Sequence, residues 1–316
     1  MRGCDNFCSY CVVPHVRGPE RSRSPGPILE EVRRLVAQGA RQITLLGQAV
    51  NQYAADEGGR RWDLADLLAE AAQTEGLARL LFITNHPSAF DDRLARVFRD
   101  VPKVCPYLHM PAQSGSDAVL ARMNRGYTAA EYLDRVAMVR ALRPDVAIAS
   151  DFIVGFPGET ESDFEATLDL VRRARFAGGF VFKYSSRPGT AAEQRMPDDV
   201  PPAEKRRRHQ ELLALLTRLG GEENQALVGR TVRAFVEELA PRPALNDRAR
   251  QAGRPAAAVP LPFNPHSAIH NPQLRGRTPC NRIVVFDGPA ELVGTEVDVR
   301  IIKARPLTLF GNLCNP

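Results

Sequence analysis

Three cysteines stand close together near the first residue, in the sequence Cys4-Asp-Asn-Phe-Cys8-Ser-Tyr-Cys11, with the spacing CxxxCxxC. Thiolates are the usual ligands of iron–sulfur clusters, and a 4Fe–4S cubane needs four ligands, one for each iron. Three thiolates on one short loop leave one iron open to an outside molecule. The spacing therefore predicts a cluster whose fourth iron binds a ligand, with the protein holding that iron in place.

A zinc site is the alternative interpretation of the same cysteines. Zinc is commonly held by four Cys or His ligands, and His15 follows Cys11 closely enough to be the fourth. The glycine and the aromatic residues around the cysteines, together with the motifs that follow, favour the cluster. Cys105, Cys280 and Cys314 are scattered through the rest of the chain. We expect them to be ordinary buried or surface thiols.

Composition and charge set the class of protein. The chain has 316 residues, of which 44% are hydrophobic and 25% charged, enough for a large core and a smaller second domain. It has no long apolar run and no leader-like start, so we expect no membrane span and a cytoplasmic location. The net charge is about −1 over residues 1–200 and +6 from residue 201 onward. This asymmetry favours a phosphate-binding appendage on a nearly neutral catalytic body.

Apolar residues along the first 200 residues alternate between helical and strand spacing. A helix is expected over 28–36 and a buried strand over 43–46. The same unit then repeats, with strands at 79–84, 104–109, 146–153 and 179–184 and helices near 62–73, 90–98, 129–142 and 161–176. Strands that alternate with helices predict a parallel sheet, with chemistry at the carboxyl ends of the strands.

The last third of the chain has a different pattern. We divide the sequence into a core at 1–200, a linker and helix at 201–228, and a β domain at 229–316 with a flexible insertion at about 241–275. Short strands are expected at 231–238, 281–287, 296–303 and 307–312, which together predict a small barrel. The helix carries the basic run 205–208. This run is either a solvated face or a contact for RNA phosphates.

Seven short motifs in order give the chain a specific resemblance. They are MRGCDNFCSYCVVPHVRGPERSR, ITLLGQAVNQY, FITNHPSAF, LHMPAQSGSDAVLARMNRGYT, ASDFIVGFPGETESDF, YSSRPGTAAEQ and GRTPCNRIVVF. The sequence resembles the methylthiotransferases of the radical S-adenosylmethionine (radical SAM) superfamily, and among them the MiaB-type tRNA-2-methylthio-N6-dimethylallyladenosine synthases. The resemblance implies an α/β fold, a partial (β/α)6 barrel, followed by a small all-β, OB-like TRAM barrel.

The resemblance also implies where the cofactors bind. Cys4, Cys8 and Cys11 would hold the 4Fe–4S cluster, and its open iron would take the amino and carboxylate groups of S-adenosyl-L-methionine. Further cofactor-binding candidates are Gly47, Gln48, Gln113, Ser114, Ser116, Asp151, Val154, Gly155 and Arg187. Capping of the next helix is an equal alternative for the serine motif at 114–116.

Two features of that family have no counterpart in the printed sequence. The first barrel strand normally precedes the cysteine loop, but only Met1-Arg2-Gly3 stand before Cys4, so we expect a barrel short by one strand and a start upstream of Met1. A second 4Fe–4S cluster, held by three cysteines of an N-terminal domain, also lacks its ligands here. Sulfur insertion by this polypeptide alone therefore stays open.

The activity implied is transfer of a methylthio group to C2 of N6-isopentenyladenosine in tRNA. The partners would be that tRNA, a flavodoxin- or ferredoxin-like electron donor and a sulfur donor. Candidate RNA-binding residues are Arg277, Asn281, Arg282 and Phe286. The alternatives are a truncated, non-catalytic tRNA-binding remnant, and methylthiolation of ribosomal protein S12 or of threonylcarbamoyladenosine in tRNA.

Overall fold

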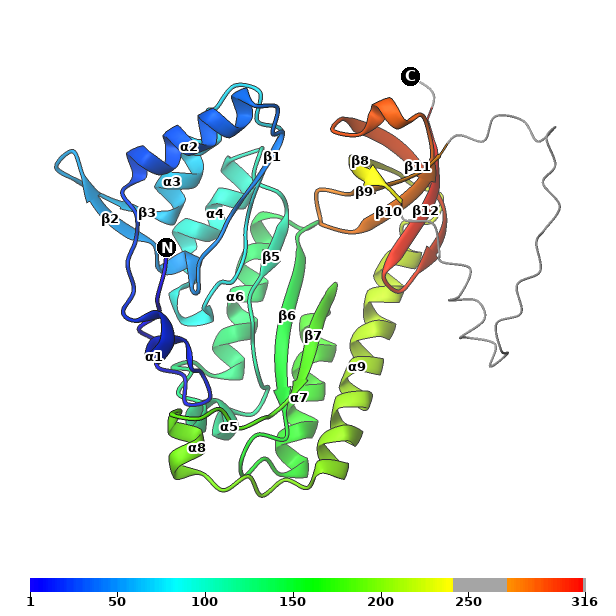
Figure 1. Ribbon diagram of the computed structural model, residues 1–316. Helices are drawn as coiled ribbons and strands as arrows, with labels where there is room; N and C mark the ends of the chain where they lie inside the picture. The colour runs from blue at the N-terminus through cyan, green and yellow to red at the C-terminus, as the bar shows by residue number, and fades with distance from the viewer. Residues whose placement is uncertain (241–271, 315–316) are drawn as a thin grey trace, which may run out of the picture. The chain divides into compact units, whose positions relative to one another are not determined.

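The computed structural model describes residues 1–240 and 272–314 (Figure 1). The chain divides into two compact units, Met1–Glu223 and Asn224–Pro316. Among the described residues, no helix has the length and apolar character needed to cross a membrane. Most of the predicted insertion at 241–275 lies outside the described residues.

Five parallel strands organise the first unit. Strand β1 (Gln42–Leu45) pairs with β4 (Arg79–Phe82), while β6 (Ala147–Val154) pairs with both β5 (Tyr107–His109) and β7 (Gly178–Lys183). An isolated parallel bridge between β4 and Val104 joins the two groups. All five strands run in one direction, so their carboxyl ends meet at the same edge. The predicted parallel α/β arrangement is confirmed.

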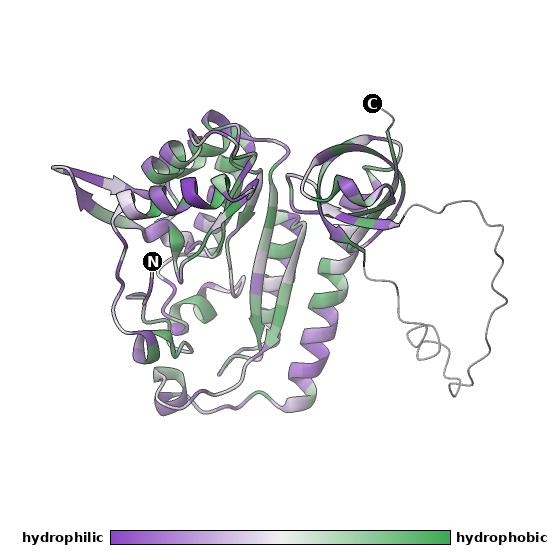
Figure 2. Cartoon of the chain, turned by 45° about the horizontal axis from the view of Figure 1, so that its top comes forward, coloured by the Kyte–Doolittle hydropathy of each residue, from purple (hydrophilic) through white to green (hydrophobic). Residues whose placement is uncertain are grey.

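Helices connect these strands and bury an apolar side against them. The main helices are α2 (Pro25–Ala37), α3 (Leu64–Ala71), α4 (Asp92–Asp100), α6 (Ala129–Leu142), α7 (Glu161–Ala174) and α9 (Pro202–Gln225). Asp63, Asp91, Thr128 and Thr160 each accept a hydrogen bond from a first-turn N–H, and these caps fix where α3, α4, α6 and α7 begin. Figure 2 shows β6 and β7 as largely hydrophobic strands.

Several short elements differ from the sequence expectations. The structure adds α1 (Val13–Arg17), the hairpin β2 (Ala54–Glu57) and β3 (Arg60–Asp63), α5 (Asp117–Arg122), α8 (Ala191–Arg195), and the 3-10 turns η1 (Val50–Gln52), η2 (Pro87–Ala89) and η3 (Ala290–Leu292). The helix expected at 62–73 begins later, because Asp63 belongs to the hairpin and caps α3.

The second unit is a closed five-stranded barrel. Its strands are β8 (Thr231–Leu239), β9 (Gln273–Arg277), β10 (Ile283–Asp287), β11 (Glu296–Arg305) and β12 (Thr308–Leu313), in the order β10-β12-β11-β8-β9. Alternate residues point inward, and Val236, Leu274, Val284 and Leu309 fill the interior. The prediction of an insertion as far as residue 275 is wrong at its end, because β9 starts at Gln273.

Candidate functional site

The cysteine loop (residues 4–11) carries three free thiols. Cys8 is buried, whereas Cys4 and Cys11 are half-buried. The Cys11 N–H donates to the Cys8 carbonyl at 2.9 Å, and Phe7 adopts a left-handed conformation with φ of 47°. The loop therefore turns tightly between its second and third cysteines.

The donor set of this loop suits an iron–sulfur cluster. Three thiols free of disulfides, close in sequence, are the ligands that such clusters use. In the described part of the chain, however, no three His, Cys, Asp or Glu side chains converge as they do around a metal ion. His15, the alternative zinc ligand, is exposed on α1 and joins no such group. The ligand roles of the cysteines stay predictions.

The cysteine loop rests on residues 122–125, which include the last residue of α5 and the segment after it and which we call the loop seat. The Ser9 N–H donates to the Met123 carbonyl at 3.0 Å, and the Ser9 hydroxyl donates to the Arg122 carbonyl at 2.8 Å. On its other side, the Ser9 carbonyl accepts a hydrogen bond from the Ala192 N–H of α8 at 2.8 Å. The loop is thus fixed between two helical segments.

Two side chains of the loop seat also reach the cysteine loop. Asn124 donates its side-chain amide to the carbonyls of Asn6, at 3.3 Å, and Phe7, at 3.0 Å. The Arg125 guanidinium Nη1 donates to the Cys8 Sγ at 3.3 Å. Burial raises the pKa of the third thiol, on Cys11. The sequence motif around residue 125 supported the resemblance, but these contacts were not predicted.

The residues predicted to contact the cofactor after β1 lie at the carboxyl end of that strand. Gly47 packs against Met1 and Val50, and a Cβ on it would come within 2.9 Å of the Met1 Cγ atom. Gln48 beside it is exposed. A side chain at position 47 would have to displace the flexible Met1 side chain and would come within 3.2 Å of the Val50 Cα atom, and the cofactor contacts of both residues stay predictions.

A second group of cofactor candidates gathers at β6. Gln113, with φ of 69°, donates its N–H to the Asp151 carbonyl at 2.8 Å and accepts the Ile153 N–H at 3.0 Å, so it extends the sheet beyond β5. Val154 is fully buried at the end of β6. Because its side chain is enclosed, only its backbone is available to a ligand.

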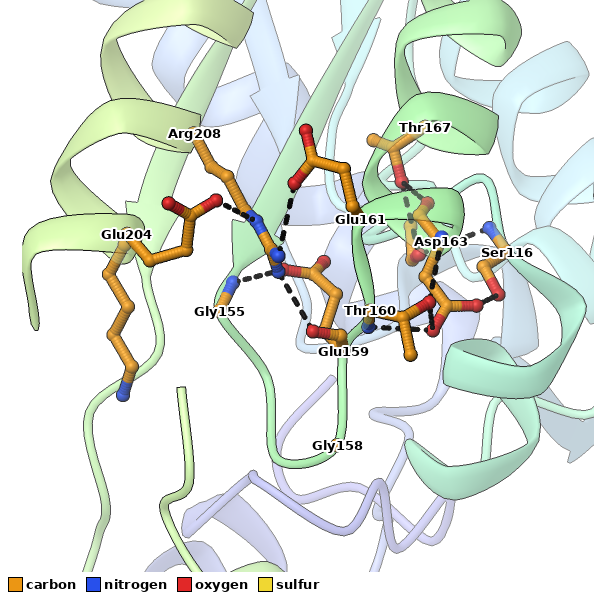
Figure 3. A network of polar contacts seen from close by, with 12 residues as sticks. Ser116, Gly155, Gly158, Glu159, Thr160, Glu161, Asp163, Thr167, Glu204 and Arg208 are labelled. Carbon is orange, nitrogen blue, oxygen red and sulfur yellow. Dashed lines mark hydrogen bonds and ion pairs between the residues drawn. The ribbon is translucent and has the colours of Figure 1, made fainter. Parts of the chain in front are cut away.

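The serine motif at 114–116 caps α5 and contacts α7. Ser116 caps α5 by accepting the Val119 N–H, and its hydroxyl donates to Asp163 of α7 (Figure 3). Ser114 is 1% exposed and lies in hydrogen-bond contact with Thr167. The capping alternative is observed at Ser116, and the cofactor contacts of both serines stay predictions.

A buried ion pair holds the turn at 155–159. Glu159 Oε2 accepts the Gly155 N–H at 2.5 Å and the Arg208 Nη1 at 2.8 Å, and the two side chains are 1% and 5% exposed (Figure 3). Gly155 has φ of 69°, and a Cβ there would lie 2.3 Å from the Lys205 Cγ atom. Helix α9 therefore fixes the turn that was predicted to bind the adenine of the cofactor.

This arrangement corrects the RNA alternative for the basic run on α9. Lys205 and Arg208 are buried, and Arg207 forms ion pairs with Glu161, Glu204 and Glu211. The pKa of the Glu204 carboxyl falls to about 2 because of its hydrogen bonds with arginine. Three of the four basic side chains thus bind carboxylates or pack inside the unit.

An exposed aromatic pair on β7 was missed by the sequence analysis. Phe180 and Phe182 are 67% and 52% exposed, and their rings are stacked with centroids 6.3 Å apart. The register pairs Phe180 with Asp151, so both side chains project from the same face of the sheet. His109 Nε2 lies 3.2 Å from Asp151 Oδ1. We call Phe180, Phe182, Asp151 and His109 the aromatic face.

The remaining cofactor candidate, Arg187, is exposed after β7. Its carbonyl accepts hydrogen bonds from the N–H and hydroxyl of Thr190, which caps α8. The backbone at this position therefore supports the helix that contacts the cysteine loop. The predicted contact of the Arg187 side chain stays a prediction.

In the second unit, the turn between β9 and β10 brings three RNA-binding candidates together. Arg277 Nη1 donates to the Asn281 Oδ1 at 3.1 Å, and Arg282 Nη1 donates to Asn224. Phe286 differs, because it is 2% exposed and lies in the barrel core. Its ring cannot stack on a base, so that prediction is corrected.

Comparison with known proteins establishes the class. The model of the radical SAM superfamily matches residues 1–171, more than half of the chain, and the chain belongs to that superfamily. The TRAM domain model matches residues 263–314. Coproporphyrinogen III oxidase (HemN) of Escherichia coli, a radical SAM enzyme, shares the fold with a TM-score of 0.51 and 18% identity, covering 70% of this chain and 51% of that one. The predicted fold class is confirmed.

Curated relatives make the resemblance more specific. The chain is 44% identical, over 98% of its length, to the tRNA-2-methylthio-N(6)-dimethylallyladenosine synthase of Rhodopirellula baltica. It is 46% identical, over 99% of its length, to the enzyme of the same name from Magnetococcus marinus. The chain spans 61% and 65% of the lengths of these two relatives. The resemblance found in the sequence is confirmed.

Proposed function

We propose that this chain contributes the radical-generating and RNA-binding parts of a tRNA methylthiotransferase that modifies C2 of N6-isopentenyladenosine. The observation that carries the proposal is a loop of three free thiols, fixed by Ser9 beside α5 and α8. The two relatives, whose names describe this modification, support the choice of substrate.

Different residues of the chain would hold the cluster and orient the cofactor. Cys4, Cys8 and Cys11 would hold the cluster, which together with S-adenosylmethionine supplies the radical chemistry when bound. The turn at 155–159 directly follows β6, and its shape is fixed by Glu159, whose carboxylate accepts the Gly155 N–H. A rigid turn positions a ligand without an ordering cost at the moment of binding.

The aromatic face supports a flat, apolar substrate group. Exposed aromatic rings stack on nucleobases, and Phe180 and Phe182 are exposed on the same face as the Asp151 carboxylate, which also contacts His109. We propose that the modified adenine lies on this face, which adjoins the turn at 155–159 that would take the cofactor, because Phe182 pairs with Ile153 just before that turn.

The second unit supports binding of an RNA backbone. The unit lies in the last third of the chain, which carries a net positive charge. The turn between β9 and β10 of its closed barrel holds Arg277, Asn281 and Arg282. Guanidinium groups suit phosphate contacts, and small barrels of this kind bind single strands. The partners we propose are a tRNA, an electron donor and a sulfur donor.

The test is reductive cleavage of S-adenosylmethionine by the full chain after anaerobic reconstitution. Replacing Cys4, Cys8 or Cys11 by alanine should abolish 5′-deoxyadenosine formation, whereas Cys105→Ala, at a buried thiol outside the cysteine loop, should leave it intact. Unchanged 5′-deoxyadenosine from the three loop variants would contradict the proposal.

A second arm separates the substrates. Mass spectrometry should find the methylthio group on tRNA rather than on ribosomal protein S12, when the sulfur donor and electron donor are supplied. If the chain only binds tRNA, with strong salt dependence and no 5′-deoxyadenosine, the non-catalytic alternative holds.

A further inference from the structure

We infer that Arg125 supplies the counter-charge for the proposed cluster and positions its ligand Cys8. This inference rests on the proposed function, because it requires that the cysteine loop hold a cluster. It adds a residue with a defined electrostatic role to a site otherwise known only by its thiols. The role follows from burial, contacts and the lack of a carboxylate partner.

Arg125 is buried, and each of its three guanidinium nitrogens donates a hydrogen bond. Its residue is 5% exposed, and its guanidinium donates to three acceptors: Cys8 Sγ at 3.3 Å, the Pro111 carbonyl at 3.0 Å and the Tyr127 hydroxyl at 3.0 Å. The guanidinium carbon also lies 5.3 Å from the centre of the Tyr127 ring. The contacts with Pro111 and Tyr127 hold the guanidinium in place independently of the cysteine loop. Its position is therefore fixed before the loop binds a cluster.

In the part of the chain that the structure describes, the positive charge of Arg125 forms no ion pair with a carboxylate. Within residues 1–240 and 272–314, no Asp or Glu oxygen lies within 4.0 Å of its nitrogens. Arginine stays protonated in proteins, and a buried charge without an opposite charge is strongly unfavourable. Its remaining acceptors, a carbonyl and a phenol, are neutral at pH 7. The sulfur of Cys8 is the one contact that belongs to the proposed cluster ligands, which such clusters bind as thiolates.

A 4Fe–4S core held by three thiolates carries a net negative charge, which grows on reduction. Hydrogen bonds to ligating sulfurs and nearby charge set the reduction potentials of such clusters. A fixed guanidinium at 3.3 Å from one sulfur favours the more negative, reduced state. Arg125 should therefore raise the reduction potential of the cluster and ease its acceptance of an electron.

The other contacts of the loop seat allow this effect to be measured separately from loop positioning. Ser9 and Asn124 hold the loop through backbone carbonyls and amides that do not involve Arg125. The loop therefore keeps several of its attachments when the guanidinium is removed. A change in potential with retained iron would report on the charge of Arg125 itself.

The experiment uses the full chain, reconstituted anaerobically, as wild type, Arg125→Gln and Arg125→Lys. The matched control is Arg206→Gln, at an exposed arginine on α9. Iron content and the midpoint potential, followed by electron paramagnetic resonance, are the readouts. We expect Arg125→Gln to weaken one-electron reduction about tenfold or more, a fall of about 59 mV or more. Arg125→Lys should fall between it and wild type, and Arg206→Gln should match wild type.

Wild-type potential and iron content in Arg125→Gln would overturn the inference. If Arg125→Gln loses iron, retention by Arg125→Lys supports the counter-charge, whereas equal loss from both variants at unchanged circular dichroism overturns it. Failure of the wild-type chain to take up iron would instead contradict the proposed function. The two failures are therefore distinguishable.

Discussion

Two buried arginines in the first unit meet very different surroundings. Arg208 is 4% exposed and forms ion pairs with Glu159, Glu161 and Glu204, whereas Arg125 is 5% exposed and contacts a thiol, a phenol and a carbonyl. The charge of Arg208 is balanced inside the chain. Burial alone therefore does not distinguish an arginine with a structural role from an arginine that binds an anionic ligand. The chemical identity of the groups it contacts makes that distinction.

Removing the balanced arginine should have the largest effect on stability. Arg208→Met would leave the Glu159 carboxylate buried without its partner, and breaking such a pair costs about 3–5 kcal/mol. The measurement is urea denaturation of the apo chain, which gives the free energy of unfolding of the first unit. A loss below about 1 kcal/mol would mean that the ion pair contributes little and would erase the contrast between the two arginines.

Removing Arg125 from the apo protein should have a smaller effect. Arg125→Met leaves no buried carboxylate without its partner, and Tyr127 still donates to the Ala112 carbonyl at 2.8 Å. The Pro111 carbonyl loses its donor, at a cost of about 1–3 kcal/mol, but the cost of burying an unbalanced charge is removed as well, so the net loss should lie below that range. The same urea titration measures it. A loss equal to that of Arg208→Met would contradict the distinction between the two arginines.

The imidazole of His86 should report on the charge of Arg125. Burial first, and then the neighbouring Arg125 and Arg135, lower the pKa of His86 to about 3. The unfolded chain binds a proton near pH 6.5 and the folded chain does not, so stability should decline as pH falls from about 6.5 toward 3. In Arg125→Met, this pKa should rise but stay below 6.5, because burial remains.

Proton NMR titration of the His86 ring gives the pKa in wild type and in Arg125→Met. Arg206→Met, which removes an equal charge from α9, should leave the value unchanged. An unchanged His86 pKa in Arg125→Met would show that Arg125 does not act on its surroundings as an unbalanced charge.

The smallest effect is expected from the neighbour of Arg208 on α9. Arg207 also binds several carboxylates, but its side chain is 44% exposed. Solvent screens exposed pairs, so Arg207→Met should change the free energy of unfolding by no more than about 1 kcal/mol. Denaturation alongside Arg208→Met tests this. Equal losses in both variants would mean that burial does not govern the strength of these pairs.

Much of the fold could be predicted because its signals are local. The helix at 129–142 matches α6 at both ends, since Thr128 provides a capping box and apolar residues recur at helical spacing. The cysteine loop was found from spacing alone. In contrast, β9 was missed because the segment Gln273–Arg277 is short, contains Gly276 and has two arginines, which hide its strand character.

The site was less predictable, because its contacts join residues far apart in sequence. Arg125 and Cys8 are separated by 117 positions, and no local pattern reveals that they meet. Phe180 and Phe182 look like core residues of a buried strand, yet only Val181 between them faces the core. The basic run on α9 looked solvated, but Lys205 and Arg208 turn inward, because helical spacing places residues three apart on one side.

The pairing of the barrel's strands has a consequence for its synthesis. Strand β12 pairs in parallel with β10 and antiparallel with β11, so it fills the gap between two strands made before it. Until Thr308–Leu313 leaves the ribosome, β10 and β11 each present an open edge to other chains. Unpaired edges invite aggregation, so the second unit is most prone to aggregate before β12 is in place.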